Sequence, residues 1–156
     1  PPRQVGEICV RTPCLMSGYW RLPQAMASCM QGNHYRTGDA GFMDEDGYVF
    51  LVDRIKDMIV SGGENIYPVE VERVLAEHPA VVDSAVIGIP DERWGEAVKA
   101  VVVSSDPALN AETLLAFIRE RIARYKVPKT VDFVDALPRN PSGKILKREL
   151  RDRYRR

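Results

Sequence analysis

The stretch AVIGIPDERWGEAVKAVVV, residues 85–103, decides the fold of this chain. Its two arms, AVIGI (85–89) and AVKAVVV (97–103), are short and mostly apolar, and a charged segment with a glycine separates them. Runs of this length and composition, rich in valine and isoleucine, are typical of strands. The stretch therefore predicts two strands joined by a turn that carries Trp94.

An amphipathic segment precedes this pair. MIVSGGENIYP (58–68) has the pattern of a strand, a glycine turn and an extended return. Pro68 then begins a predicted helix, whose Val71, Val74 and Leu75 share one face until residues 78–79 end it.

A second helix is predicted over residues 110–124, with Asn110 as its N-cap. Its apolar residues recur at helical spacing and form a core-facing stripe: Leu114, Leu115, Ile118 and Ile122. TVDFV (130–134) is a third predicted strand, and residues 146–156 form a basic terminal helix. Elements in this order predict an α+β fold, a small three-stranded sheet with helices packed on it.

The first third of the chain has a different pattern. Residues 6–20 alternate and break at Gly and Pro, and residues 42–52 place Asp46 and Gly47 between two apolar arms, which predicts a hairpin. Residues 1–55 are therefore expected to be β-rich, and they are too few to build a core of their own. Because the chain starts with PPRQVGE and without methionine, we expect a fragment of a longer protein.

Composition limits the possible functions. The 156 residues, 45% of them hydrophobic, are enough to bury one core. The 22 basic and 22 acidic residues cancel, so no global field favours nucleic acid. Residues 139–156 are strongly basic, however, which leaves open a different class of function, a stand-alone module that binds a polyanion.

Cys9, Cys14 and Cys29 are odd in number and lack CxxC spacing, so we expect reduced thiols and no metal site. His78, before Pro79, is expected to cap the end of its helix. No apolar run approaches the roughly 20 residues of a membrane span, and no signal peptide is present. We therefore expect a cytoplasmic protein without a transmembrane segment; peripheral contact with a membrane stays open, and nothing indicates an oligomeric state.

A lysine-bearing glycine turn, NPSGKILKREL (140–150), lies close to the end of the chain. It resembles the tail of a phosphate-binding loop, but Pro138 stands where a Walker A loop needs glycine. The nucleotide-loop interpretation of this stretch alone therefore fails.

Three further motifs, YRTGD (35–39), DRIKD (53–57) and SGGEN (61–65), are equally compatible with a turn, a charged surface run and a hairpin loop. Their order and spacing, with GEI and GYW upstream and PRNPSGKI downstream, resemble the closing part of the acyl-adenylate-forming enzymes. This superfamily includes acyl-CoA synthetases, beetle luciferases and peptide-synthetase adenylation domains. The chain is most similar to bacterial fatty acyl-CoA synthetases, which implies that residues 1–55 end the large domain and residues 56–156 form the C-terminal lid domain.

The resemblance implies a role for each motif. Asp39 would accept both ribose hydroxyls of ATP, with Tyr35 and Thr37 in the same ATP/AMP-binding motif, and Arg54 would reach the ribose and phosphates. Lys56 would be the hinge between the domains. The catalytic residue would be Lys144, whose charge stabilises the α-phosphate while the acyl-adenylate forms.

For CoA, the resemblance implies that Gly62, Gly63 and Glu64 line the channel of the pantetheine arm. The aromatic and basic residues that would meet the CoA nucleotide are Trp94, Tyr125 and Lys126. Trp94 is equally compatible with a half-buried packing role.

The implied reaction joins a carboxylic acid, a fatty acid in the nearest resemblance, to ATP and then to CoA. Mg²⁺ would accompany ATP, bound mainly by phosphates and by residues outside this chain. A ligase that loads a carrier protein is the alternative within the superfamily. Because the phosphate loop and the acyl pocket of the family lie upstream of these motifs, we expect this chain alone to be inactive.

Overall fold

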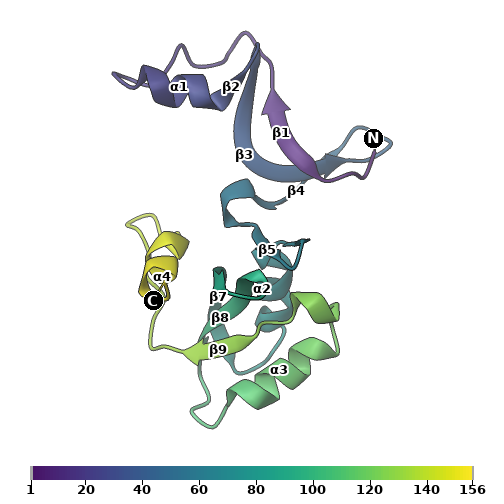
Figure 1. Ribbon diagram of the computed structural model, residues 1–156, viewed down its shortest axis with the longest axis vertical. Coiled ribbons are helices and arrows are strands. Elements are labelled where there is room, and N and C mark those ends of the chain that lie inside the picture. The colour runs from purple at the N-terminus through teal and green to yellow at the C-terminus, as the bar shows by residue number, and fades with distance from the viewer. Residues whose placement is uncertain (1, 156) are drawn as a thin grey trace. The chain divides into compact units, whose positions relative to one another are not determined.

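The computed structural model describes residues 2–155 and divides into two compact units, Pro1–Lys56 and Asp57–Arg156, called here the N-terminal and C-terminal units (Figure 1). The structure contains both sheets and helices, as expected of an α+β fold.

The N-terminal unit is an antiparallel sheet built around one long strand. Strand β3 (His34–Met43) pairs with β1 (Gly6–Val10), β2 (Met30–Gln31) and β4 (Val49–Arg54), and the helix α1 (Pro23–Cys29) precedes β2. The predicted hairpin around Asp46 and Gly47 joins β3 to β4. Ala40 is the one fully buried apolar residue among the described residues of this unit, so the core of this unit is small.

The C-terminal unit contains a mixed five-stranded sheet. The predicted strands are found as β7 (Val81–Asp91), β8 (Gly95–Ser104) and β9 (Thr130–Phe133), and β9 runs parallel to β8. The expected three-stranded sheet is two strands too small, because β5 (Ile59–Ser61) and β6 (Glu64–Ile66) form a hairpin that joins β8 through the Ser61–Gly95 pair.

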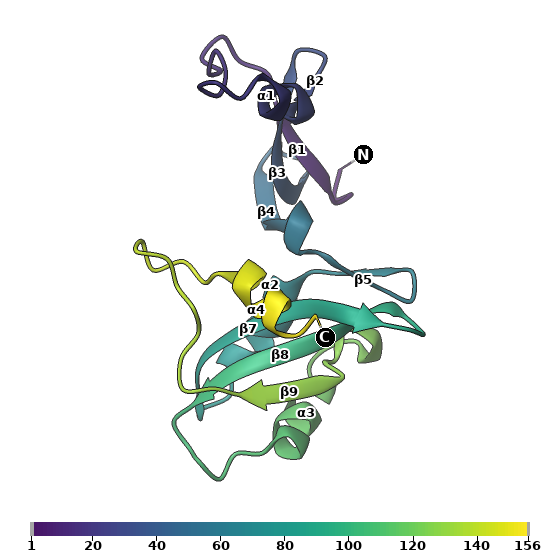
Figure 2. The ribbon, with the colours of Figure 1, turned by 60° about the vertical axis from the view of Figure 1, so that its left-hand side comes forward.

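Three helices pack on this sheet: α2 (Pro68–Ala76), α3 (Ala111–Arg119) and α4 (Lys147–Arg153) (Figure 2). The helix α3 starts as predicted, since the Asn110 side chain accepts a hydrogen bond from the Thr113 amide at 3.0 Å. It ends before residue 124, because the amides of Arg121 and Ile122 both bond to the Ile118 carbonyl in a tight closing turn. A 3₁₀ turn, η2 (Arg124–Lys126), follows.

The sheet has an apolar core on each face, which explains the composition of residues 85–103. Along β7 and β8, alternate residues point to opposite faces. One face packs against α2 and α3 and contains Val86, Val98 and Ala100. The other face contains Ala85, Ile87 and Val101 and packs against Leu150 of α4. Strands buried on both sides are continuous apolar runs rather than alternating ones.

Candidate functional site: a lysine turn, a carboxylate–guanidinium pair and a glycine–tryptophan contact

The Lys144 turn is closed by hydrogen bonds to Asn140. The Asn140 side-chain oxygen accepts from the Lys144 amide and from the Ser142 hydroxyl, both at 2.8 Å, and the Asn140 amide donates to the Lys144 carbonyl at 2.9 Å. Gly143 has a φ of 83°, which glycine adopts without strain. The turn therefore has a defined shape that presents the Lys144 side chain to solvent.

The Lys144 ammonium has no hydrogen-bond or ion-pair partner among the described residues, whereas three other lysines of the C-terminal unit do. Lys99 pairs with Asp132 at 2.7 Å, Lys126 with Glu70 at 2.5 Å and Lys147 with Glu72 at 2.7 Å. A cation held on a rigid turn without a protein anion is available for an anionic ligand.

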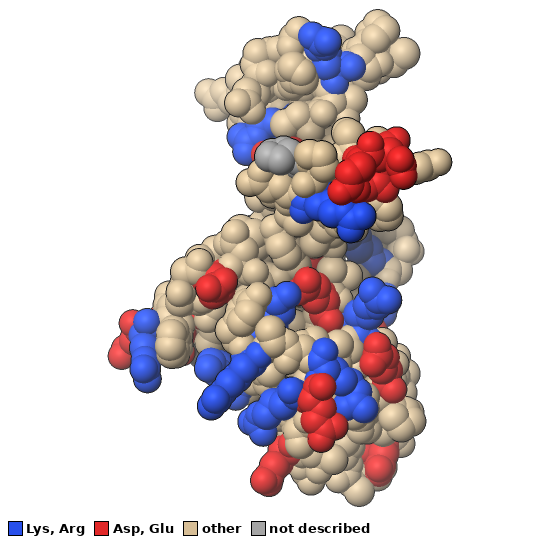
Figure 3. Space-filling model, turned by 90° about the vertical axis from the view of Figure 1, so that its right-hand side faces the viewer, with Lys and Arg blue, Asp and Glu red and all other residues tan. Residues whose placement is uncertain are grey.

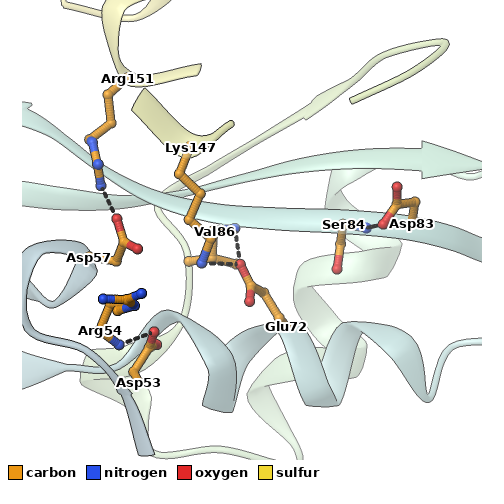
Figure 4. A network of polar contacts seen from close by, with 9 residues as sticks. All are labelled: Asp53, Arg54, Asp57, Glu72, Asp83, Ser84, Val86, Lys147 and Arg151. Atoms are coloured by element: carbon orange, nitrogen blue, oxygen red, sulfur yellow. Dashed lines mark hydrogen bonds and ion pairs between the residues drawn. The ribbon is translucent and has the colours of Figure 1, made fainter. Parts of the chain in front are cut away.

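The helix after this turn is fixed to the rest of the C-terminal unit. The Glu72 carboxylate accepts from Lys147 of α4 and from the Val86 amide of β7, the latter at 2.8 Å (Figure 4). Arg151 pairs with Asp57 at 2.9 Å, and both side chains are largely buried. Leu150 lies between these two contacts and is 1% exposed.

In the N-terminal unit, the predicted ATP-binding residues lie together on β3 and β4. Asp39 and Arg54 are cross-strand partners, and their side chains form an ion pair at 3.0 Å. Thr37 hydrogen-bonds to the Asp39 amide at 3.0 Å and to the Ile8 carbonyl at 2.9 Å, so it shapes the backbone rather than presenting a free hydroxyl. Gly38, between them, has a φ of 74°.

Tyr35 is held by a residue of the GYW motif, for which the sequence indicated no individual role. Its hydroxyl lies 3.1 Å from that of Tyr19, and this hydrogen bond, with partial burial, raises the pKa of Tyr19 to about 12. Tyr35 is thereby oriented from the GYW motif, 16 residues upstream.

Lys56 lies in a short 3₁₀ turn, η1 (Ile55–Asp57), and is exposed. The division between the two units falls directly after it. Its role as a hinge stays a prediction.

The glycine motif and Trp94 are brought into contact. Gly62 donates its amide to the Trp94 carbonyl at 2.9 Å, and a Cβ at Gly62 would lie 2.7 Å from Cε3 of the indole. Gly63 is different, because a Cβ added at this position would have no atom within 4 Å. Glu64, the third residue of the motif, starts β6 and is exposed.

Two cations approach the Trp94 ring: Arg93 at 4.7 Å and Lys129 at 5.5 Å from its centroid. The indole remains 38% exposed. The resemblance pointed to Trp94 but to neither cation: Arg93 directly precedes Trp94, and Lys129 comes from a segment 35 positions later in the chain. The result is an exposed aromatic surface with positive charge beside it, which suits a nucleotide base and its phosphate.

Tyr125 and Lys126 form part of η2 and lie together, with the ammonium 5.6 Å from the ring centroid. Lys126 is engaged by Glu70 of α2. Burial lowers the pKa of Lys126, but the hydrogen bond and charge of Glu70 outweigh it and the net pKa is raised. Tyr125 is exposed, while Lys126 is held as a structural cation.

The remaining candidates are His78 and the three cysteines. The C-cap of α2 is Glu77 rather than the expected His78, whose Nδ1 instead accepts a hydrogen bond from the Ala80 amide, beyond the helix, at 3.2 Å. The three cysteines are free thiols. Across residues 2–155 there is no cluster of three or more His, Cys, Asp or Glu side chains with metal-binding geometry. In the same range, no helix is both long and apolar enough to cross a membrane.

Comparison with known proteins identifies the family. Residues 70–144 match the AMP-binding enzyme C-terminal domain. The chain is 51% identical over 155 residues to the fatty acid–[acyl-carrier-protein] ligase ScoC of Streptomyces coeruleorubidus, covering 99% of this chain and 30% of that protein. It is 48% identical over 155 residues to a long-chain-fatty-acid–CoA ligase of Escherichia coli, covering 99% and 28%.

Among solved structures, ATP-bound MatB from Rhodopseudomonas palustris matches with a TM-score of 0.92 and 41% identity, over 99% of this chain and 31% of that one. The chain thus spans about 30% of the length of these relatives. Fold, motifs and relatives agree: the chain belongs to the acyl-adenylate-forming enzymes and contains their AMP-binding enzyme C-terminal domain.

Proposed function

We propose that this chain is the C-terminal part of an ATP-dependent acyl-CoA ligase that acts on fatty acids. Residues 1–55 end a large domain, and residues 56–156 form a lid that pivots at Lys56. A carboxylate first attacks ATP to give acyl-AMP and pyrophosphate, and the CoA thiol then displaces AMP. Mg²⁺ accompanies ATP and is held mainly by its phosphates and by residues outside this chain.

The observation that carries this proposal is the free Lys144 ammonium on its rigid turn. Negative charge builds on the α-phosphate oxygens while acyl-AMP forms, and a prepositioned cation stabilises that charge. Lys99, Lys126 and Lys147 are each paired with a carboxylate, so they are less suited to this task.

The Asp39–Arg54 pair suits the ribose of a nucleotide. A carboxylate has two acceptor oxygens, which match the two hydroxyls of a ribose, and the guanidinium beside it can turn to a phosphate. Both side chains are partly exposed, at 34% and 42%, so a ligand can reach them.

Trp94 favours CoA over a carrier protein as the acyl acceptor. The phosphopantetheine arm is common to both acceptors, but only free CoA brings an adenosine and two further phosphates. The indole with Arg93 and Lys129 beside it offers stacking and positive charge for those groups. ScoC, by its name, loads a carrier protein, so this alternative stays within the family.

The polyanion-binding alternative is disfavoured by the ion pairs of the basic end. The pairs Arg139–Asp83, Lys147–Glu72 and Arg151–Asp57 each neutralise a cation. Acidic and basic side chains are also interspersed on the face of the C-terminal unit shown in Figure 3. A phosphate backbone needs a continuous basic surface. We place the enzyme in the cytoplasm, because its three free thiols suit a reducing compartment.

A chimera tests the function. This chain replaces the matching part of the Escherichia coli long-chain-fatty-acid–CoA ligase, to which it aligns over 155 residues. We expect acyl-CoA synthesis from fatty acid, ATP and CoA. In the chimera, Lys144→Ala should slow acyl-AMP formation, followed as fatty-acid-dependent pyrophosphate exchange, by about 100-fold or more, while supplied acyl-AMP still reacts with CoA.

Gly63→Leu should show the reciprocal defect. The new side chain enters the open space beside Gly63 and blocks the thiol channel, so acyl-AMP forms but CoA does not consume it. Arg148→Gln, at a 91%-exposed side chain on α4, is the charge-removing control and should leave both steps unchanged. Equal losses in both steps for Lys144→Ala would refute its assignment to adenylation.

A further inference from the structure

The Lys144 turn is tied to strand β7 by a contact with a residue outside its own sequence motif. Arg139 stands at the start of the turn, and its Nη1 donates to the Gly143 carbonyl, the residue before Lys144. Its Nη2 pairs with Asp83 Oδ2 of β7 at 2.5 Å. The other oxygen of Asp83 accepts from the Ser84 amide at 3.0 Å, so the carboxylate is itself oriented by the sheet backbone.

This contact sets where the turn lies, whereas the Asn140 hydrogen bonds set only its shape. The Asn140 bonds all join residues 140–144 to one another. Arg139 instead links the turn to a residue 56 positions away. A guanidinium is planar and offers several N–H donors in a fixed arrangement. It can therefore hydrogen-bond to the Gly143 carbonyl and the Asp83 carboxylate at the same time.

A second anchor lies on the other side of the lysine. Lys147, three residues after Lys144, pairs with Glu72, and Glu72 bonds to the Val86 amide of β7. The turn is thus held at both ends against the same strand, at Asp83 and at Val86.

We propose that Arg139 and Asp83 are positioning residues for Lys144, which act through the Gly143 carbonyl and are needed for the adenylation step alone. This inference rests on the proposed role of Lys144. A long, flexible lysine side chain can reach a transition state only if its backbone starts from the right place. A displacement of about 1 Å can cost on the order of 100-fold in rate.

Asp83→Asn is the test variant. The amide keeps the size of the carboxylate and an oxygen for the Ser84 amide, but it loses the charge that holds Arg139. Glu120→Gln is the matched control, because it removes the carboxylate of an exposed ion pair with Arg121 that does not touch the turn.

The first measurement needs no activity. In this chain, hydrogen exchange of the Gly143 and Lys144 amides should accelerate about tenfold in Asp83→Asn, because the turn loses its outer anchor. Exchange of the core amides at Leu114 and Ile118 should not change. Unchanged exchange at residues 143–144 would overturn the anchoring role.

The second measurement uses the chimera. Asp83→Asn should lower kcat of acyl-AMP formation about tenfold, with KM for ATP and fatty acid and the rate of the CoA step unchanged. The same substitution in a Lys144→Ala background should cause no further loss. Full adenylation activity of Asp83→Asn, in a chimera that Lys144→Ala inactivates, would refute the positioning role.

The outcomes separate this inference from the proposed function. If Lys144→Ala leaves acyl-AMP formation by the chimera unchanged, the proposed function is contradicted. The positioning role then fails with it, even if hydrogen exchange shows that the Arg139–Asp83 contact holds the turn. An additive loss in the double variant would mean that Asp83 acts independently of Lys144 and would overturn the inference while the proposed function stands.

Discussion

Substitution of Gly62 by alanine should disturb Trp94, and substitution of its neighbour Gly63 should not. Both glycines lie in the left-handed region, with φ of 60° and 85°, so alanine at either position is strained by about 1 kcal/mol. At Gly62 alone, the new Cβ would also meet the indole at 2.7 Å. The ring must then move by about 0.7 Å to reach an ordinary 3.4 Å contact.

The cost of that movement sets the magnitude. Overpacking of this kind costs about 1–3 kcal/mol, so Gly62→Ala should destabilise the C-terminal unit by about 2–4 kcal/mol in total. Gly63→Ala should cost about 1 kcal/mol. For a domain of this size, each kcal/mol corresponds to about 4–8 °C in the unfolding midpoint.

Tryptophan fluorescence is the assay. Trp20 is 84% exposed, so Trp20→Phe in every sample leaves Trp94 as the only reporter at little cost. Gly62→Ala should shift the Trp94 emission in the native state and lower the midpoint of thermal unfolding. Gly63→Ala should lower the midpoint less and leave the emission unchanged. Identical spectra and midpoints in the two variants would refute the contact.

The remaining predictions concern pH and local stability. Glu70 raises the pKa of Lys126 above its ordinary value of 10.5. The Lys126–Glu70 pair therefore contributes its full stabilisation at pH values below the pKa of Lys126 in the unfolded chain. That stabilisation is lost as the pH rises through the pKa of Lys126 in the folded protein. Glu70→Gln should therefore lower the free energy of unfolding by less than about 1 kcal/mol at pH 7, since solvent screens the pair. At a pH well above the pKa of Lys126 in the folded protein, the substitution should not change the free energy of unfolding. Denaturant unfolding at both pH values checks this. The amides of β3 and β4 should exchange faster than those of β7 and β8, because Ala40 is the one fully buried apolar residue described in the N-terminal unit. Equal protection of the two sheets by mass spectrometry would contradict this.

Local patterns were enough to predict most of the C-terminal unit. The strands β7 and β8 follow from their apolar runs, and α2 begins at Pro68 and stops before residues 78–79 as expected. The return strand after the glycine turn was also predicted. Its membership of the sheet was not, because a single pair of residues, Ser61 and Gly95, joins it to β8.

The contacts that complete the site could not be predicted, because they join distant positions. Glu70 meets Lys126, and Asp83 meets Arg139, each across 56 residues. Nothing local in charge pattern distinguishes these carboxylates from others on the surface. Asn140 is different: an asparagine two residues before Ser142 is a known turn former, so its central role in the Lys144 turn could have been inferred from the sequence.

The bond from the Val86 amide to Glu72 has a consequence for solubility. Strand β7 ends the sheet on its side, and such a strand normally presents outward amides that another chain can join to extend the sheet. Here a carboxylate from α2 occupies the donor at Val86, and Lys147 covers that carboxylate in turn. A second molecule that approached this edge would have to displace a charged pair to bond there. The residues that hold α4 in place thus also protect the sheet against aggregation.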